Sequence, residues 1–141
     1  MRKKQLFRFG NKKTGKIAKV IALGVLLGSV GNTIVMAGNI TDQYYHFEVE
    51  DTYAHATSTR TKEDTTSSYI DHYGNTPVYV EVCSEGVNYT AGSGRYYVTN
   101  GNYQYLDNYV YESGKRNCYL RIYSSENKRT ALYGVWSPDS I

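Results

Sequence analysis

A few side chains in this sequence have residue types and spacing that could do chemistry. His46, Glu48 and Glu50 alternate, so on an extended chain all three project from one face. This spacing can bring nitrogen and oxygen ligands onto one metal ion, with Asp71 and His72 joining from another strand. A solvated outer face is the commoner meaning of such alternation. We therefore predict no metal site and no cofactor.

Two short motifs match those of penicillin-recognising enzymes. Ser-x-x-Lys occurs at Ser125–Lys128, and Lys-Thr-Gly occurs at Lys13–Gly15. The first falls in a polar turn between expected strands rather than on a helix, and the second falls in the N-terminal leader. No other set of nucleophile, base and oxyanion donor stands out, so the sequence indicates a protein that is not an enzyme.

Cys83 and Cys118 are the two cysteines of the chain. Export would permit a disulfide between them, closing a loop of about 35 residues. Strand alternation places Cys118 on the apolar face and Cys83 on the opposite face, so the bond requires a β-bulge or the strand end near Ser84–Gly86. We predict a Cys83–Cys118 disulfide, with two free thiols as the alternative.

Tyrosine is unusually frequent, and all sixteen tyrosines follow residue 37. Each offers a large ring with a polar tip, which suits contact with sugars or proteins. We select Tyr96, Tyr97 and Tyr105 as a candidate contact surface. The alternative is structural, because tyrosine is favoured in strands and can replace Leu and Phe in a core that has few of them.

The N-terminus has the three parts of a secretory signal peptide. Eight Lys and Arg residues and no acid precede Val20, and Val20–Val30 is almost wholly apolar. Val35 and Ala37 then occupy the −3 and −1 places of a small-residue cleavage site. We predict a signal peptide over residues 1–37 and a secreted, extracellular domain over residues 38–141.

An uncleaved membrane anchor is the alternative for this segment. Spanning a bilayer takes about 20 consecutive apolar residues. The apolar run here is interrupted by Ser29, Asn32 and Thr33. Cleavage is therefore the preferred expectation, and membrane contact is expected only through the signal peptide before cleavage.

Removing the leader reverses the sign of the net charge. The full chain is +3, whereas residues 38–141 contain eight Lys and Arg against all thirteen Asp and Glu, which gives −5. Binding to nucleic acid needs clustered cations that release counterions. We predict no nucleic-acid partner.

The positioning elements after residue 37 are expected to be strands. Tyr, Val and Thr dominate this part, turn residues recur, and no stretch shows helical periodicity. Seven strands are predicted, at Tyr44–Ala54, Ser68–Tyr73, Val78–Glu85, Arg95–Thr99, Tyr103–Tyr111, Asn117–Ser124 and Thr130–Trp136.

The expected fold class is therefore all-β, a small antiparallel β-sandwich of about seven strands, with a small barrel as the alternative. The polar stretch His55–Ser68 is expected to be a long loop. Trp136, the single tryptophan, is expected to be buried because it ends the last strand of a core poor in leucine.

Three segments together resemble a known group of proteins: the acidic, Tyr-rich Asp42–Tyr53, the Arg-x-Lys-x-Asp…Ser-Ser-x-Tyr stretch Arg60–Tyr69, and Tyr133–Ser140 with its Gly-x-Trp. The chain resembles an uncharacterised family of small secreted proteins from Gram-positive bacteria, known only as a domain of unknown function. The resemblance implies an extracellular bacterial setting. It implies no activity, cofactor or catalytic residue, and no disulfide.

A fainter similarity links the chain to secreted β-sandwich bacteriocins of the lactococcin type, which also have signal peptides and Tyr/Gly-rich β structure. Two functions are therefore expected. The first is a secreted non-enzymatic protein that binds an extracellular protein or a cell-envelope component. The alternative is a bacteriocin-like effector that acts on the envelope of competing cells.

Overall fold

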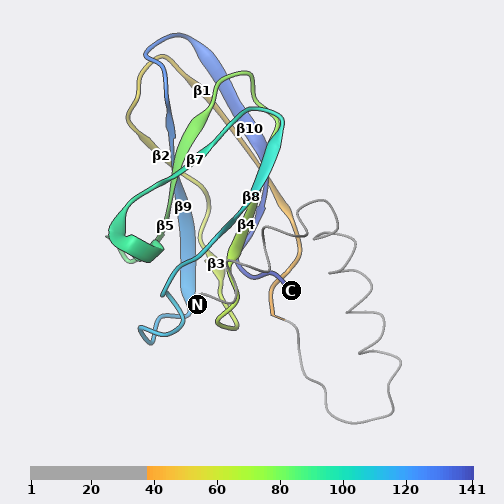
Figure 1. Cartoon of the computed structure of the whole chain (residues 1–141), viewed down its shortest axis with the longest axis vertical. Helices are drawn as coiled ribbons and strands as arrows, with labels where there is room; N and C mark the ends of the chain where they lie inside the picture. The colour runs from red at the N-terminus through yellow and green to blue at the C-terminus, as the bar shows by residue number, and fades with distance from the viewer. Residues whose placement is uncertain (1–37) are drawn as a thin grey trace, which may run out of the picture.

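The computed structural model describes residues 38–141, and the predicted signal peptide lies outside the described part. The described chain forms ten strands and one short 3-10 helix (Figure 1). The elements are β1 Gln43–Val49, β2 Ala54–Ala56, β3 Arg60–Thr61, β4 Ser68–His72, β5 Val78–Ser84, β6 Val87–Asn88, η1 Ala91–Ser93, β7 Tyr96–Val98, β8 Asn102–Leu106, β9 Asn117–Ser124 and β10 Thr130–Ser137. None of the described residues belongs to a helix with the length and apolar character to cross a bilayer.

The strands form two antiparallel sheets. Sheet A has the order β1-β10-β4-β8, and sheet B has the order β2-β9-β5-β6, with β3 also paired to β9 and β7 also paired to β5. Figure 1 shows sheet A on the right and sheet B on the left. The predicted all-β antiparallel sandwich is confirmed.

Each predicted strand corresponds to an observed one, and β9 has the predicted bounds. The structure adds three strands of two or three residues, β2, β3 and β6. β3 and most of β2 lie in the segment predicted as a long loop, and β6 lies between two predicted strands. β2 and β3 pair with β9 at its edge. Strands this short do not show an alternation that a sequence pattern can reveal.

The core lies between the two sheets, where alternate residues of each strand point inward. Trp136 is fully buried, as expected. The buried apolar cluster consists of Tyr45, Val49, Ile70, Val78, Val80, Val82, Val98, Leu106, Val110, Cys118, Leu120, Ile122, Leu132 and Trp136.

A chain of buried hydrogen bonds crosses sheet A inside this core. Gly134 of β10 pairs with Tyr45 on one side and His72 on the other. The Tyr45 hydroxyl reaches His72 Nδ1 at 2.8 Å, and His72 Nε2 lies 2.7 Å from the Thr76 carbonyl oxygen. A carbonyl only accepts, so Nε2 carries the proton and Nδ1 accepts from Tyr45. Burial lowers the pKa of His72, which favours this neutral form.

Candidate functional site

The outer face of sheet B brings alternate residues of three strands together. Tyr79 of β5 pairs with Tyr97 of β7 and Tyr123 of β9, and the neighbouring pair on the same face is Glu81 with Arg121. Directly opposed residues in antiparallel strands share a face. We name the resulting group the tyrosine–arginine surface, and it consists of Tyr79, Arg95, Tyr97, Tyr119, Arg121 and Tyr123.

Glu81 lies beneath the side chains of Arg95 and Arg121 and holds both of them in place. It is only 6% exposed. Its carboxylate accepts hydrogen bonds from Arg95 Nε at 2.9 Å and the Tyr123 hydroxyl at 3.0 Å, and Arg121 Nη1 lies 3.6 Å away. Two guanidinium groups against one carboxylate leave a local charge of +1, opposite in sign to the −5 of residues 38–141.

The rings of this surface are ordered by contacts with one another and with arginine. Arg95 Cζ lies 3.8 Å from the centroid of the Tyr123 ring, within the range of a cation–π interaction. The Tyr79 and Tyr97 centroids are 5.1 Å apart at an interplanar angle of 50°. Burial and the hydrogen bond to Glu81 raise the pKa of Tyr123, so its hydroxyl remains a donor at neutral pH.

The three tyrosines predicted as one contact surface do not share a face. Tyr97 lies on the tyrosine–arginine surface. Tyr96 packs against the core on the other side of β7, and its hydroxyl oxygen accepts a hydrogen bond from the Asp107 N–H at 3.0 Å. Tyr105 lies in β8 of sheet A opposite Tyr69, and it is 7% exposed. Alternation along β7 separates Tyr96 from Tyr97, and the sandwich separates both from Tyr105.

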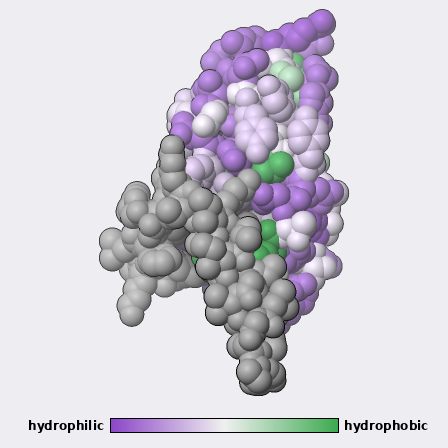
Figure 2. Space-filling model, turned by 90° about the vertical axis from the view of Figure 1, so that its right-hand side faces the viewer, coloured by the Kyte–Doolittle hydropathy of each residue, from purple (hydrophilic) through white to green (hydrophobic). Residues whose placement is uncertain are grey.

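The outer face of sheet A is also rich in tyrosine. Tyr44, Asp71 and Tyr103 lie in one row across the sheet. The His46 ring stacks on Tyr133, with centroids 5.8 Å apart. Figure 2 views the molecule from this side and shows aromatic rings gathered among hydrophilic side chains. Asp71 is the charged residue of this row. The outer face of sheet A therefore combines tyrosine rings with a negative charge, whereas the tyrosine–arginine surface of sheet B is positive.

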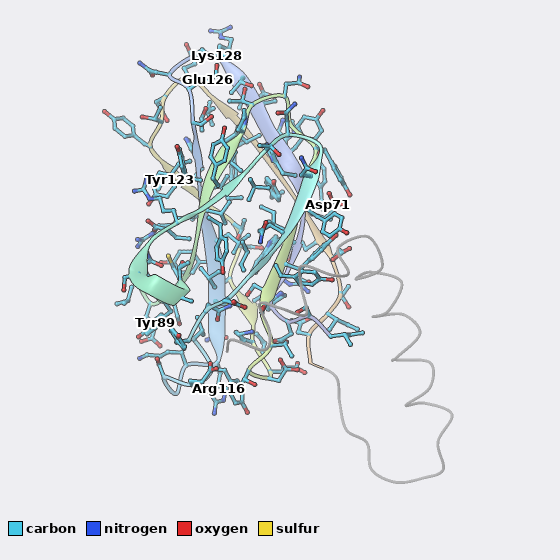
Figure 3. The ribbon with its side chains drawn as sticks, in the orientation of Figure 1. Asp71, Tyr89, Arg116, Tyr123, Glu126 and Lys128 are labelled. Atoms are coloured by element: carbon cyan, nitrogen blue, oxygen red, sulfur yellow. The ribbon has the colours of Figure 1, made fainter. Side chains whose placement is uncertain are left out.

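Strand alternation divides the residues considered as metal ligands. His46 Nε2 lies 2.7 Å from Glu48 Oε2 on the outer face of β1, and Glu50 forms an ion pair with an arginine after β9. Asp71 also faces outward, on the side of the sandwich opposite Tyr123 (Figure 3). His72, the next residue, points into the core. Within residues 38–141, no three His, Cys, Asp or Glu side chains are placed to share a metal ion.

The predicted Cys83–Cys118 disulfide is wrong, because both cysteines are free and buried. Cys83 pairs directly with Tyr119, so it shares a face with Tyr119, and Cys118 must point to the other face. No bulge interrupts this register. The two thiols therefore lie on opposite sides of sheet B, and the bond cannot form without rearranging the strands.

A second candidate site lies where two distant segments meet. Lys62 follows β3, and Asp139 follows β10. Lys62 Nζ donates to Asp139 Oδ1 at 2.7 Å, and both side chains are fully buried. The same nitrogen donates to the carbonyl oxygens of Thr66 at 2.6 Å and Pro138 at 2.9 Å. All three ammonium hydrogens therefore have acceptors.

Backbone N–H groups hold the Asp139 carboxylate. Oδ2 accepts from Asn39 at 2.7 Å and from Glu63 at 2.8 Å, and Oδ1 accepts from Asp64 at 3.4 Å. A second carboxyl group, that of Asp64, lies alongside and accepts from the N–H of Thr66 at 2.8 Å and from its hydroxyl. Burial raises the pKa of Asp64, and the negative charge of Asp139 adds to this effect.

The sequence did not reveal Lys62 and Asp139 as a pair, because they are 77 positions apart along the chain. The available signal was that each lies in one of the segments that carried the family resemblance. The structure brings these two segments together. Arg60 Nη1 also joins them by donating to the Trp136 carbonyl oxygen at 3.1 Å.

A family model described as "Protein of unknown function (DUF2712)" matches residues 33–140. No curated protein and no solved structure matches the chain. The match spans the whole described sandwich, including the tyrosine–arginine surface and the Lys62–Asp139 pair. The resemblance to an uncharacterised family is therefore confirmed, whereas the Gram-positive origin and the bacteriocin similarity stay predictions.

Proposed function

Since the chain belongs to the DUF2712 family of proteins of unknown function, its role has to be argued from its own surfaces, and we propose that it is a secreted, non-enzymatic β-sandwich protein that binds an extracellular or cell-envelope partner. Export is supported by the basic and apolar leader over residues 1–37. Binding is assigned to the tyrosine–arginine surface.

The observation that carries the proposal is the ordered tyrosine–arginine face above a nearly buried Glu81. Glu81 uses its carboxylate to fix both arginines, so little side-chain freedom remains to be lost when a ligand binds. Tyrosine adds rigid contact area with a polar tip. Tyr97, one of the residues selected from the sequence, is 52% exposed at the edge of this group.

Charge indicates the class of partner. The surface is locally cationic on a domain of net charge −5. Arginine binds carboxylate and phosphate groups through paired N–H donors, and tyrosine rings stack on the faces of sugar rings. An anionic, sugar-bearing polymer of the cell envelope fits both properties. Long-range repulsion from the acidic remainder of the domain would restrict binding to this face.

The test uses the full-length gene expressed in a Gram-positive host, with the protein collected from the culture medium. It is added to a panel of Gram-positive cells, and both retained protein and growth are scored. The same cells are compared after mild acid extraction of their anionic wall polymers. The proposal expects retention without growth arrest and loss of retention after extraction.

Other outcomes lead to different conclusions. Growth arrest in some strains would contradict a passive binder and favour the bacteriocin-like effector. Retention that survives extraction would overturn the anionic polymer as partner. A protein that stays in solution with every strain would overturn surface binding altogether.

A further inference from the structure

We infer that the Lys62 ε-amino group and the Asp139 side-chain carboxyl group condense within the folded protein to form an intramolecular amide bond. The bond would join the residue after β3, at the edge of sheet B, to the tail that follows β10 of sheet A. This is a single-turnover reaction of the protein with itself, and it does not depend on the binding surface proposed above.

The surroundings of Lys62 direct its amine at the carboxyl group. A neutral amine has two N–H donors and one lone pair. The two N–H groups are matched by the Thr66 and Pro138 carbonyl oxygens, at 2.6 and 2.9 Å from Nζ. The remaining direction leads to Asp139, whose Oδ1 lies 2.7 Å away. Loss of one proton therefore leaves the lone pair on the side of the Asp139 carboxyl group.

The surroundings of Asp139 are suited to a tetrahedral intermediate. Attack on the carboxyl carbon places negative charge on one oxygen. Oδ2 already accepts two backbone N–H donors, from Asn39 at 2.7 Å and Glu63 at 2.8 Å. Two preorganised backbone donors on one oxygen form an oxyanion hole. Oδ1 lies on the amine side and is the oxygen that leaves.

The Asp64 carboxyl group lies beside the Lys62–Asp139 pair, close enough for both charges to act on its pKa. The absence of a side chain at Gly38 leaves room for the two carboxyl side chains, because a Cβ atom added there would lie 2.5 Å from Asp64 Oδ2 and 3.0 Å from Asp139 Cβ. Burial raises the pKa of Asp64, so it can hold a proton more readily than an exposed aspartate. We assign Asp64 as the proton relay between the amine and the departing oxygen.

The reaction balances without any other reactant. Lys62 gives a proton through Asp64 to Asp139 Oδ1, and the neutral nitrogen attacks the carboxyl carbon to form the N–C bond. The C–Oδ1 bond then breaks, a second proton from the nitrogen passes to the departing oxygen, and one water molecule leaves. The ammonium–carboxylate pair and the amide differ by that water alone, so no oxidant or activated carrier is needed.

The fold favours the reaction in two ways. Nucleophile and carboxyl group are held in contact, which replaces a bimolecular encounter by an intramolecular one. Both side chains are fully buried, so bulk water is kept away from the amide and its hydrolysis is disfavoured. The product would close a loop spanning 77 positions. Such a crosslink would give an exported chain with two free cysteines the covalent stabilisation that a disulfide would otherwise supply.

The test is the intact mass of the protein secreted from its full-length gene, measured after denaturation and compared with the mass of the same chain calculated from its mapped N-terminus. We expect a deficit of one water molecule in most molecules. Proteolysis and fragmentation should give a branched peptide that joins Lys62 to Asp139. A secreted, folded protein with the full mass, and with Lys62 recovered at an ordinary cleavage site, would overturn the inference.

Three variants separate the bond from its mechanism. Lys62→Arg keeps a cation and should show no deficit, and Asp139→Ala should show none even if little folded protein is recovered. Asp64→Asn keeps an acceptor oxygen for Thr66 but cannot carry a proton, so linkage in the folded variant should be slower by about a hundredfold. Linkage at the wild-type rate in Asp64→Asn would remove the relay role and leave the bond.

Discussion

Lys62 Nζ lies 2.7 Å from Asp139 Oδ1, although the two residues are 77 positions apart and neither side chain is exposed. The pair connects the segment after β3, at the edge of sheet B, to the tail after β10 of sheet A, so it links the two sheets of the sandwich. A buried ion pair is tolerated only when its remaining donors and acceptors are satisfied. Here backbone carbonyl and N–H groups satisfy both partners.

Removing one partner should therefore destabilise the fold strongly. Lys62→Met leaves the Asp139 carboxylate buried without a cation, and we expect a loss of about 3–5 kcal/mol in the free energy of unfolding relative to wild-type chains in which the amide has not formed. Lys128→Met is the matched control, because Lys128 forms an exposed pair with Glu126 and should change stability by less than about 1 kcal/mol. Urea unfolding of both variants measures the difference, and equal losses would contradict the role of the pair.

Gly134→Ala should also destabilise the protein. A Cβ atom at this position would overlap the Asp71 carbonyl oxygen and lie 3.0 Å from the Tyr45 hydroxyl. It would disturb both the β10–β4 pairing and the hydrogen bond from Tyr45 to His72. We expect a loss of about 3 kcal/mol or more, measured by thermal unfolding.

Gly94→Ala is the control for this substitution, since a Cβ atom at Gly94 would meet nothing within 4 Å. We expect its unfolding temperature to stay near that of the wild type. If Gly134→Ala were as stable as Gly94→Ala, the close approach at Gly134 would not limit the fold.

The strands could be predicted from the sequence, whereas the contacts between distant residues could not. Alternating Val, Leu and Ile residues located the main strands, because one face of each strand packs against the core and the other faces water. The same alternation placed Cys83 and Cys118 on opposite faces, and the predicted disulfide required a bulge that does not occur. The pairing of Lys62 with Asp139 depends on how β3 and β10 are brought together, which no local pattern contains.

The separation of the selected tyrosines has the same cause. Tyr96 and Tyr97 are consecutive in one strand, so their side chains point to opposite faces. Tyr105 lies in sheet A because β8 pairs with β4, which the local sequence does not reveal. The arginines of the tyrosine–arginine surface were not selected from the sequence. Their role depends on Glu81, which is 14 positions from Arg95 along the chain.

The free energy of unfolding should decrease as the pH is lowered through the range where His72 takes up a proton. Burial lowers the folded-state pKa of His72, so the unfolded state takes up the proton first as the pH falls. Stability is fully present above the ordinary histidine pKa of about 6.5 and is lost below it, by at most about 1.4 kcal/mol per pH unit.

His72→Gln should reduce this slope between pH 7.5 and pH 5, measured by urea unfolding at each pH. The raised pKa of Asp64 acts in the opposite direction, because its folded form takes up a proton first. Comparison of the two slopes therefore isolates the contribution of His72. An unchanged slope would contradict a buried neutral His72.

Both cysteines should be slow to react while the protein is folded. Burial raises the pKa of Cys83 to about 11 and that of Cys118 to about 12, so little thiolate exists at neutral pH. We expect slow labelling by a thiol reagent in native buffer and labelling of both cysteines in denaturant without a reductant. Denatured protein that shows no free thiol would restore the disulfide.

The central claim, that the tyrosine–arginine surface binds the envelope, is tested most directly by equilibrium binding to purified cell walls. Tyr97→Ala is compared with Tyr44→Ala, which removes a similarly exposed tyrosine, 59% against 52%, from the opposite sheet. Losing one exposed aromatic contact of about 1–2 kcal/mol should raise the Kd of Tyr97→Ala roughly tenfold. Tyr44→Ala should bind as the wild type does. Wild-type affinity in Tyr97→Ala, together with weakened binding in Tyr44→Ala, would contradict the account and move the binding site to sheet A.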